Sequence, residues 1–350
     1  MKTALVTLCL ILIGMLSVPV ISLLYELGGG AACLRCHEMG RSYEQWLSSS
    51  HRAIPCTRCH GDALSGDLAF HLTNVLRVKE HFLGKIAERP QLSTADILSM
   101  PSRCAPCHRQ EYAQWSTGPH SVCYNRLFLN VKHNQEQQLT DDCLRCHGMH
   151  FNGGIGDLVQ PISTRGPWVL RRKDLADQPA IPCSACHAMH RPGRLLAKWS
   201  IEPRPTGPFQ ELVRPSVGFF DRRSQQSINL SLLPLPAMQE ADRSVPISPD
   251  MRQAICYQCH APLATLQVRS GDDRTPIGVH EGLGCFACHD QHRQTTRASC
   301  ANCHPRLSNC GIPVEAMDTS FTNPDSAHNI HFVKCTDCHP KGVPPKKKVR

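Results

Sequence analysis

The residues of this chain that could do chemistry are cysteines and histidines in one repeated pattern. Cys-x-x-Cys-His occurs nine times in 350 residues, and two cysteines per copy use 18 of the 21 cysteines. The cysteines of the nine copies are Cys33, Cys36, Cys56, Cys59, Cys104, Cys107, Cys143, Cys146, Cys183, Cys186, Cys256, Cys259, Cys285, Cys288, Cys300, Cys303, Cys335 and Cys338. The histidines that end them are His37, His60, His108, His147, His187, His260, His289, His304 and His339.

The spacing of the pattern has a direct chemical meaning. Cysteines at i and i+3 lie on one side of a helical turn, so both sulfurs can reach the two vinyl groups of one porphyrin. The histidine that follows is then placed under the iron as its proximal ligand. A lone Cys-x-x-Cys could be a redox dithiol or half of a zinc site, and a disulfide framework would not require histidine after each pair. The pattern therefore predicts nine covalently attached c-type haems and a chain that carries electrons.

Histidines outside the motifs are candidates for the opposite face of each haem. The chain has 20 histidines, so 11 remain after the nine in the motifs. Three motifs extend to Cys-x-x-Cys-His-x-x-His, and this second histidine cannot easily fold back under the same iron, so we expect it to bind a neighbouring haem. The three are His150, His190 and His292, and the other candidate distal ligands are His51, His81, His120, His280, His328 and His331. This supply favours haems with two histidine ligands, which suit electron transfer better than substrate binding.

Composition indicates a fold built around its cofactors. Only 5% of the residues are aromatic, and there are 27 prolines and 23 glycines, so the chain alone would bury little apolar surface. We expect a mainly α protein with short helices, much irregular loop and little or no sheet, wrapped around stacked haems.

The net charge of +9 could indicate nucleic acid as a partner. Nine haems, each with two propionates, would add about nine negative charges, and we therefore exclude nucleic acid.

The N-terminus predicts export. Ala4 to Leu24 is apolar except for Thr7, Ser17, Pro19 and Ser22, which is long enough for a bilayer and longer than a usual signal-peptide core. Lys2 precedes this segment, and the positive-inside rule places the rest of the chain outside the cytoplasm. We expect one N-terminal transmembrane helix in the inner (cytoplasmic) membrane, with the bulk of the protein in the periplasm. A signal peptide cleaved near residues 28–32, giving a secreted or extracellular protein, is the alternative.

The first motif lies in a longer pattern. It continues to Met39, and Tyr43, Trp46, residues 49–51 and the segment His81-Phe82-Leu83-Gly84 follow it. This pattern resembles the NapC/NirT/NrfH family of membrane-anchored quinol dehydrogenases.

The resemblance implies that Met39 binds the iron of the first haem in place of His37. The alternative is that Met39 packs against the porphyrin, as methionines readily do. The family also places lysine and acidic residues at a quinol site near this haem, and Lys79 and Glu80 are the counterparts here. Arg77 stands where relatives have an acidic residue.

The positions of the motifs predict four parts. Residues 1–30 form the membrane anchor or signal peptide, and residues 31–150 a four-haem region similar to NapC and NrfH. Residues 151–250 hold the fifth haem and a Pro-rich connection, and residues 251–350 form a C-terminal four-haem region. In motif type, the later regions resemble hydroxylamine oxidoreductase and tetrahaem cytochromes.

Cys123 and Cys310 lie outside the motifs, and a disulfide, a soft axial ligand and free thiols all remain open for them.

The leading functional prediction is a nonahaem c-type cytochrome in anaerobic-type respiration. It would take electrons from the membrane quinol pool, with quinol dehydrogenase activity as an open question. The electrons would pass to another redox protein, a periplasmic or outer-membrane cytochrome or reductase. One alternative is a terminal reductase or oxidase of a small nitrogen or sulfur compound with one open haem. A second alternative is a secreted haem conduit for extracellular electron transfer, and a homo-oligomer is open in each case.

Overall fold

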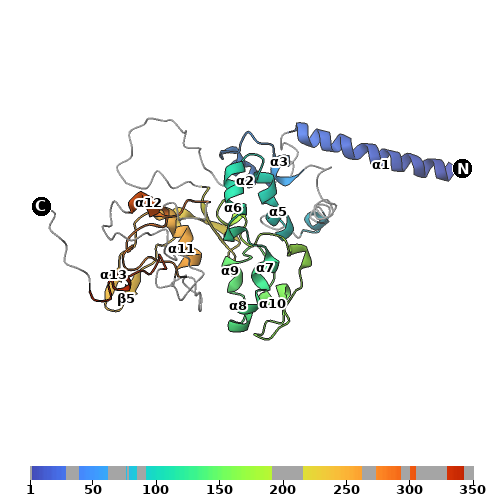
Figure 1. The fold of residues 1–350 in the computed structure, drawn as a ribbon. Coiled ribbons are helices and arrows are strands. Elements are labelled where there is room, and N and C mark those ends of the chain that lie inside the picture. The colour runs from blue at the N-terminus through green and yellow to red at the C-terminus, as the bar shows by residue number, and fades with distance from the viewer. Residues whose placement is uncertain are drawn as a thin grey trace, which may run out of the picture. The chain divides into compact units, whose positions relative to one another are not determined.

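The structure is a computed structural model of the chain, and it divides into two compact units. It describes residues 2–28, 39–61, 76, 79–84, 92–190, 216–261, 273–292, 300–304 and 329–342. The first unit consists of Met1–His108 and Ala188–Glu202, and the second consists of Arg109–His187 and Pro203–Arg350. In both units the elements are short, apart from α1 (Figure 1).

The first unit is helical where it is described. Its helices are α1 (Lys2–Leu27), α2 (Gly40–Leu47), α3 (Cys56–His60) and α5 (Thr94–Cys104). α5 begins where the Ser93 side chain accepts a hydrogen bond from the backbone N–H of Asp96, which satisfies one of the free donors of the first turn. At the other end of α5, Arg103 donates to the carbonyl oxygen of Cys59 at 2.6 Å. This bond holds α5 and α3 together.

The N-terminal helix corrects one prediction. Within the described part of the chain, no helix combines the length and the apolar character that crossing a membrane requires. The expected transmembrane helix is therefore wrong as part of the fold class, and so is the expected anchoring in the inner membrane. α1 also contains Pro19, which has no backbone N–H to donate within a helix.

The second unit is a series of short helices and hairpins. Its helices and 3₁₀ turns are α6 (Arg109–Ser116), η3 (Pro119–Ser121), α7 (Tyr124–Phe128), α8 (Val131–Glu136), α9 (Cys143–Cys146), α10 (Ile155–Leu158), η4 (Lys173–Leu175), η5 (Cys183–Ala185), η7 (Leu230–Leu232), η8 (Met251–Gln253), α11 (Ala254–His260), η9 (Cys285–Ala287), α12 (Cys300–Cys303) and α13 (Cys335–Cys338). Over the described ranges, sheet is limited to three antiparallel pairs. They are β1 (Val159–Gln160) with β2 (Val169–Leu170), β3 (Gly218–Asp221) with β4 (Gln226–Asn229), and β5 (Met238–Glu240) with β6 (Arg243–Val245). The expectation of a mostly helical and loop-rich chain is confirmed.

A small apolar core in the second unit joins three of the haem motifs. It consists of Met149, Ala185, Phe219, Leu230, Leu233 and Ala254. Met149 follows the motif at Cys143, Ala185 lies inside the motif at Cys183, and Ala254 begins the helix of the motif at Cys256. The β3–β4 hairpin contributes Phe219 to this core. A side chain at Gly218 would clash with the backbone carbonyl of Ile228 on the paired strand, so glycine is needed there.

Replacing Phe219 tests this core. Phe219 is 4% exposed, and Phe219→Ala removes a buried ring, which typically lowers the free energy of unfolding by about 3–5 kcal/mol. Leu232→Ala is the control, because Leu232 is 74% exposed and its loss should leave stability nearly unchanged. Denaturant unfolding of the haem-loaded protein measures both. Equal stability losses in the two variants would show that the core does not hold these motifs together.

Candidate haem sites

Each described Cys-x-x-Cys-His segment forms one helical turn. In six motifs the backbone N–H of the histidine donates to the carbonyl oxygen of the first cysteine, at 2.8 to 3.0 Å. The motifs at Cys56 and Cys256 lie within α3 and α11. No disulfide joins the described cysteine side chains of these motifs, so their sulfurs could form thioether bonds. The predicted turn is thus confirmed where the chain is described; Cys33, Cys36 and His37 lie outside the described residues, as does the side chain of Cys338.

In the first unit, two motif histidines lie opposite histidines from other parts of the chain. The ring centres of His60 and His190 are 5.9 Å apart, and those of His51 and His108 are 6.1 Å apart. His60 and His108 belong to motifs. His51 and His190 are distal ligands in the sequence prediction, and His190 comes from a Cys-x-x-Cys-His-x-x-His extension 130 residues beyond its partner.

The second unit repeats this arrangement four times. The pairs are His120 with His260 at 6.2 Å, His187 with His292 at 6.1 Å, His280 with His304 at 6.3 Å, and His289 with His331 at 6.2 Å between ring centres. Each pair again joins one motif histidine to one candidate distal histidine.

The spacing of the six pairs fits one iron between the two rings. Metal–imidazole bonds are about 2 Å long, so two rings on opposite sides of one metal have centres roughly 6 Å apart. Rings in direct aromatic contact vary in separation with their relative orientation. Here the interplanar angle ranges from 18° to 77°, while the separation stays between 5.9 and 6.3 Å. One metal bound by both rings would fix the distance between the ring centres whatever the angle between the ring planes.

Hydrogen bonds orient two of the candidate distal histidines. Nδ1 of His190 lies 3.0 Å from the carbonyl oxygen of Ser42, and Nδ1 of His280 lies 3.2 Å from that of Ile330. A carbonyl oxygen can only accept, so Nδ1 carries the hydrogen in both rings. Nε2 of the neutral ring then keeps its lone pair for a metal, the arrangement usual for metal-bound histidine.

The environment of the rings favours their neutral form. Burial, followed by the neighbouring His190, lowers the pKa of His60 to about 4. Burial also lowers the pKa of His51, with a further contribution from His108, and that of His280, where His304 adds to the effect. A neutral imidazole is the form that binds metal, so these rings are ready ligands at neutral pH.

Motifs also lie beside one another through their cysteines. The neighbouring Cys285 raises the pKa of the Cys256 thiol, and the neighbouring Cys146 raises that of the Cys259 thiol. Cys186 lies close enough to act electrostatically on both Cys256 and Cys259. The motif at Cys256 therefore adjoins three others, those at Cys143, Cys183 and Cys285.

Cysteine side chains also lie near one another in two further pairs of motifs. Cys288 lies near Cys300 and Cys303, and Cys59 lies near Cys104 and Cys107. The motif at Cys285 thus adjoins the motif at Cys300 in the second unit, and the motifs at Cys56 and Cys104 adjoin in the first.

Other predicted site residues have different surroundings. His150 is buried, with Nε2 3.0 Å from the Ser184 hydroxyl and its ring centre 4.0 Å from that of Phe220. Burial lowers its pKa to about 4. His81 is exposed beside Phe82, and its role and that of His150 as distal ligands stay predictions.

The residues of the predicted quinol site are described in part. Lys79 and Glu80 are exposed on the helical turn that includes His81, and Met39 is half-buried just before α2. His328, Arg77 and Cys310 lie outside the described residues. Cys123 is half-buried at the start of α7.

Sequence reasoning missed the polar side chains that fasten the motifs. Arg103 binds the carbonyl of Cys59, and the fully buried Gln253 binds the backbone N–H of Cys285. Neither belongs to a motif. The one sequence signal is their place, one to three residues before the first cysteine of a motif.

Comparison with known proteins locates one match. Residues 242–305 match the family model described as cytochrome c7 and related cytochrome c. This segment resembles multihaem cytochromes c. It contains the motifs at Cys256, Cys285 and Cys300, and the match supports covalently bound c-type haem and electron transfer as the role of the chain. It gives no support to the narrower resemblance to NapC/NirT proteins or to hydroxylamine oxidoreductase. No curated protein and no solved structure matches the chain.

Removal of one distal histidine tests the pairing. His120→Ala should leave the haem at His260 without its second histidine, because the two rings face each other at 6.2 Å. We expect one haem to change from low-spin to high-spin, as measured by electron paramagnetic resonance and resonance Raman spectroscopy. His133→Ala is the control, since His133 is an exposed histidine of the same unit and should change nothing. An entirely low-spin His120→Ala protein would refute this pair.

Proposed function

We propose that the protein is an electron-transfer cytochrome with nine covalently attached haems, most of them held between two histidines. The observation that carries the proposal is the constant separation of six histidine ring pairs, 5.9 to 6.3 Å, each with one motif histidine. Bound haem supplies a one-electron redox centre. We assign no distal ligand to the other three motif histidines, His37, His147 and His339.

The residues of the chain have separable roles in this function. The two cysteines of each motif attach the porphyrin, and the helical turn places the motif histidine on one side of it. The distal histidine closes the opposite side, so that neither water nor substrate binds the metal. A change of redox state then requires little rearrangement, which favours rapid electron exchange over chemistry on a bound substrate.

Distal histidines also bring different haems together. In the second unit, His292 follows the motif at Cys285 and faces His187. His280 precedes the same motif and faces His304. The peptide of one haem thus supplies a ligand to another, which keeps these haems of the second unit close. Together with the adjoining cysteines, this supports a connected path for electrons within that unit.

The pairs favour electron relay over a terminal reductase. A reductase needs an iron with an open coordination position, and in six of the nine sites we propose that histidine fills both. Backbone carbonyl oxygens hold two of the distal rings, those of His190 and His280, in place. The relay therefore accounts for the described sites better than the enzyme does.

We propose quinol as the electron donor, with entry at the haem of Cys33–His37, and another redox protein as the acceptor. The support for this donor is the sequence from Cys33 to Met39 and the exposed Lys79 and Glu80. Methionine at this place is not special to the first motif, because Met149 and Met189 also follow their motif histidines by two residues. Of these, Met149 packs in the apolar core.

Replacing Met39 tests the entry point. Met39→Leu keeps the size of the side chain and removes the sulfur, so reduction by a soluble quinol analogue should slow while reduction by dithionite is unchanged. Met189→Leu is the matched control, since Met189 has the same place in a motif whose His187 already faces His292. Stopped-flow absorption at the haem bands measures both rates. Full-rate quinol reduction of Met39→Leu would rule out Met39 as a ligand that controls entry.

A further inference from the structure

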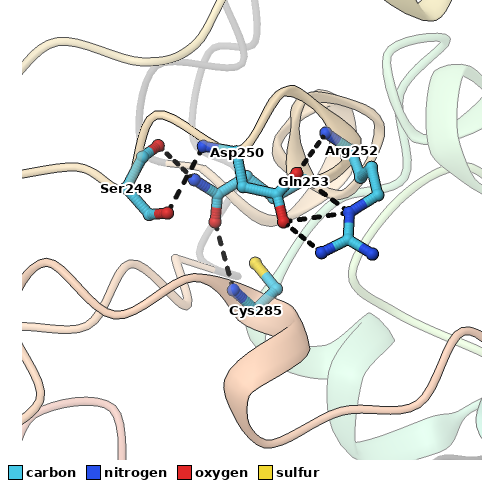
Figure 2. A network of polar contacts seen from close by, with 5 residues as sticks. All are labelled: Ser248, Asp250, Arg252, Gln253 and Cys285. Carbon is cyan, nitrogen blue, oxygen red and sulfur yellow. Dashed lines mark hydrogen bonds and ion pairs between the residues drawn. The ribbon is translucent and has the colours of Figure 1, made fainter. Parts of the chain in front are cut away.

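Gln253 is a fully buried polar side chain that lies between two haem motifs. It is 0% exposed and precedes α11, which carries the motif Cys256–His260. Its Nε2 donates to the carbonyl oxygen of Ser248 at 2.5 Å. Its Oε1 accepts from the backbone N–H of Cys285 at 3.1 Å (Figure 2). One amide group thus fastens the start of the motif at Cys285 to the helix of the motif at Cys256.

Residues beside Gln253 strengthen this connection. Arg252 donates to both carboxylate oxygens of Asp250, with the shortest contact at 2.6 Å (Figure 2). The same guanidinium lies over the ring of Phe286, 4.9 Å from its centre. Such a cation–π contact is attractive. Phe286 follows Cys285 directly, so two neighbouring side chains of one turn hold the same motif.

The two motifs that Gln253 bridges also lie close together at their cysteines, which would attach the haems. The Cys285 side chain lies next to that of Cys256 and raises the pKa of its thiol, so the sulfurs that would hold two haems lie close together. His260 and His289 of these motifs face His120 and His331. Because the sulfurs, both axial pairs and the Gln253 bridge belong to the same unit, the distance between the two haems depends on this bridge.

We propose that Gln253 is a positioning residue that fixes the motif Cys285–His289 against the motif Cys256–His260 and so sets electron exchange between their two haems. The proposal rests on the proposed function, since it assumes that both motifs hold haem. Gln253 touches neither porphyrin attachment atom of its own motif and acts through the backbone of Cys285. Its amide is suited to this role because it donates on one side and accepts on the other, and an apolar side chain of equal size can do neither.

Two variants perturb the contact between Gln253 and Cys285. One changes Gln253 itself, and the other changes Gly284, the residue before Cys285. Gln253→Leu removes both hydrogen bonds. Gly284→Ala leaves Gln253 in place but adds a Cβ that would lie 3.1 Å from the Ser248 hydroxyl and 3.5 Å from Gln253 Oε1, so the Ser248 side chain beside the bridge must shift by a few tenths of an ångström. Gln239→Leu is the matched control, because Gln239 is an exposed glutamine of β5 in the same unit and lies outside every haem motif.

The experiment uses the full haem-loaded protein and three readouts. Intact mass counts the haems, and Soret circular dichroism measures the exciton coupling between neighbouring haems. Flash photoreduction measures the rate at which electrons spread among them. We expect Gln253→Leu and Gly284→Ala to keep the haem count and low-spin spectra of the wild type, with a loss of coupling and a slower phase. Gln239→Leu should match the wild type.

The outcomes separate this inference from the proposed function. Haem-free wild-type protein would overturn the proposed function. Full haem content with unchanged coupling and rate in both Gln253→Leu and Gly284→Ala would overturn the role of Gln253 alone. An equal loss in Gln239→Leu would also overturn it, because the effect would then not be specific to the glutamine that bridges the two motifs. If Gln253→Leu fails to fold, Gly284→Ala decides.

Discussion

The separation of paired imidazole rings is the constraint on which the rest of this structure depends. Six pairs hold nearly the same separation although their interplanar angles differ widely. Rings in direct contact would approach according to their orientation, whereas rings that share a metal must keep its bond lengths. Helices, turns and hairpins therefore need to bury little apolar surface against one another, provided that they place the two histidines of each pair opposite each other.

The polar contacts explain how a chain with few aromatic residues delivers those histidines. Backbone carbonyls fix the tautomers of His190 and His280, Arg103 ties two motifs of the first unit, and Gln253 ties two motifs of the second. The core around Phe219 is small and lies where three motifs converge. Packing and hydrogen bonding thus act on the same few segments as the proposed metal ligation. Electron exchange between haems is sensitive to all three because it depends on their separation.

Sequence predicted the chemistry of the sites better than their arrangement. Cys-x-x-Cys-His spacing is local, so the helical turn and the proximal histidine follow from it. The extension to His-x-x-His draws attention to His190 and His292, whose rings lie opposite motif histidines. It does not predict His60 and His187 as their partners, because those pairs form across more than 100 residues. The same rule predicts His150 as a ligand of a neighbouring haem; its ring lies against Phe220, and this role stays a prediction. Apolar length alone suggested a membrane helix, which the structure does not support.

The central claim is that one iron lies between each paired motif and distal histidine. An anomalous-scattering map of the haem-loaded crystal, recorded at the iron edge, locates every iron directly. The account predicts an iron midway between the two rings of all six pairs, with nine irons in the whole chain. Irons bound by a different distal histidine, or by water where a paired histidine is expected, would contradict it.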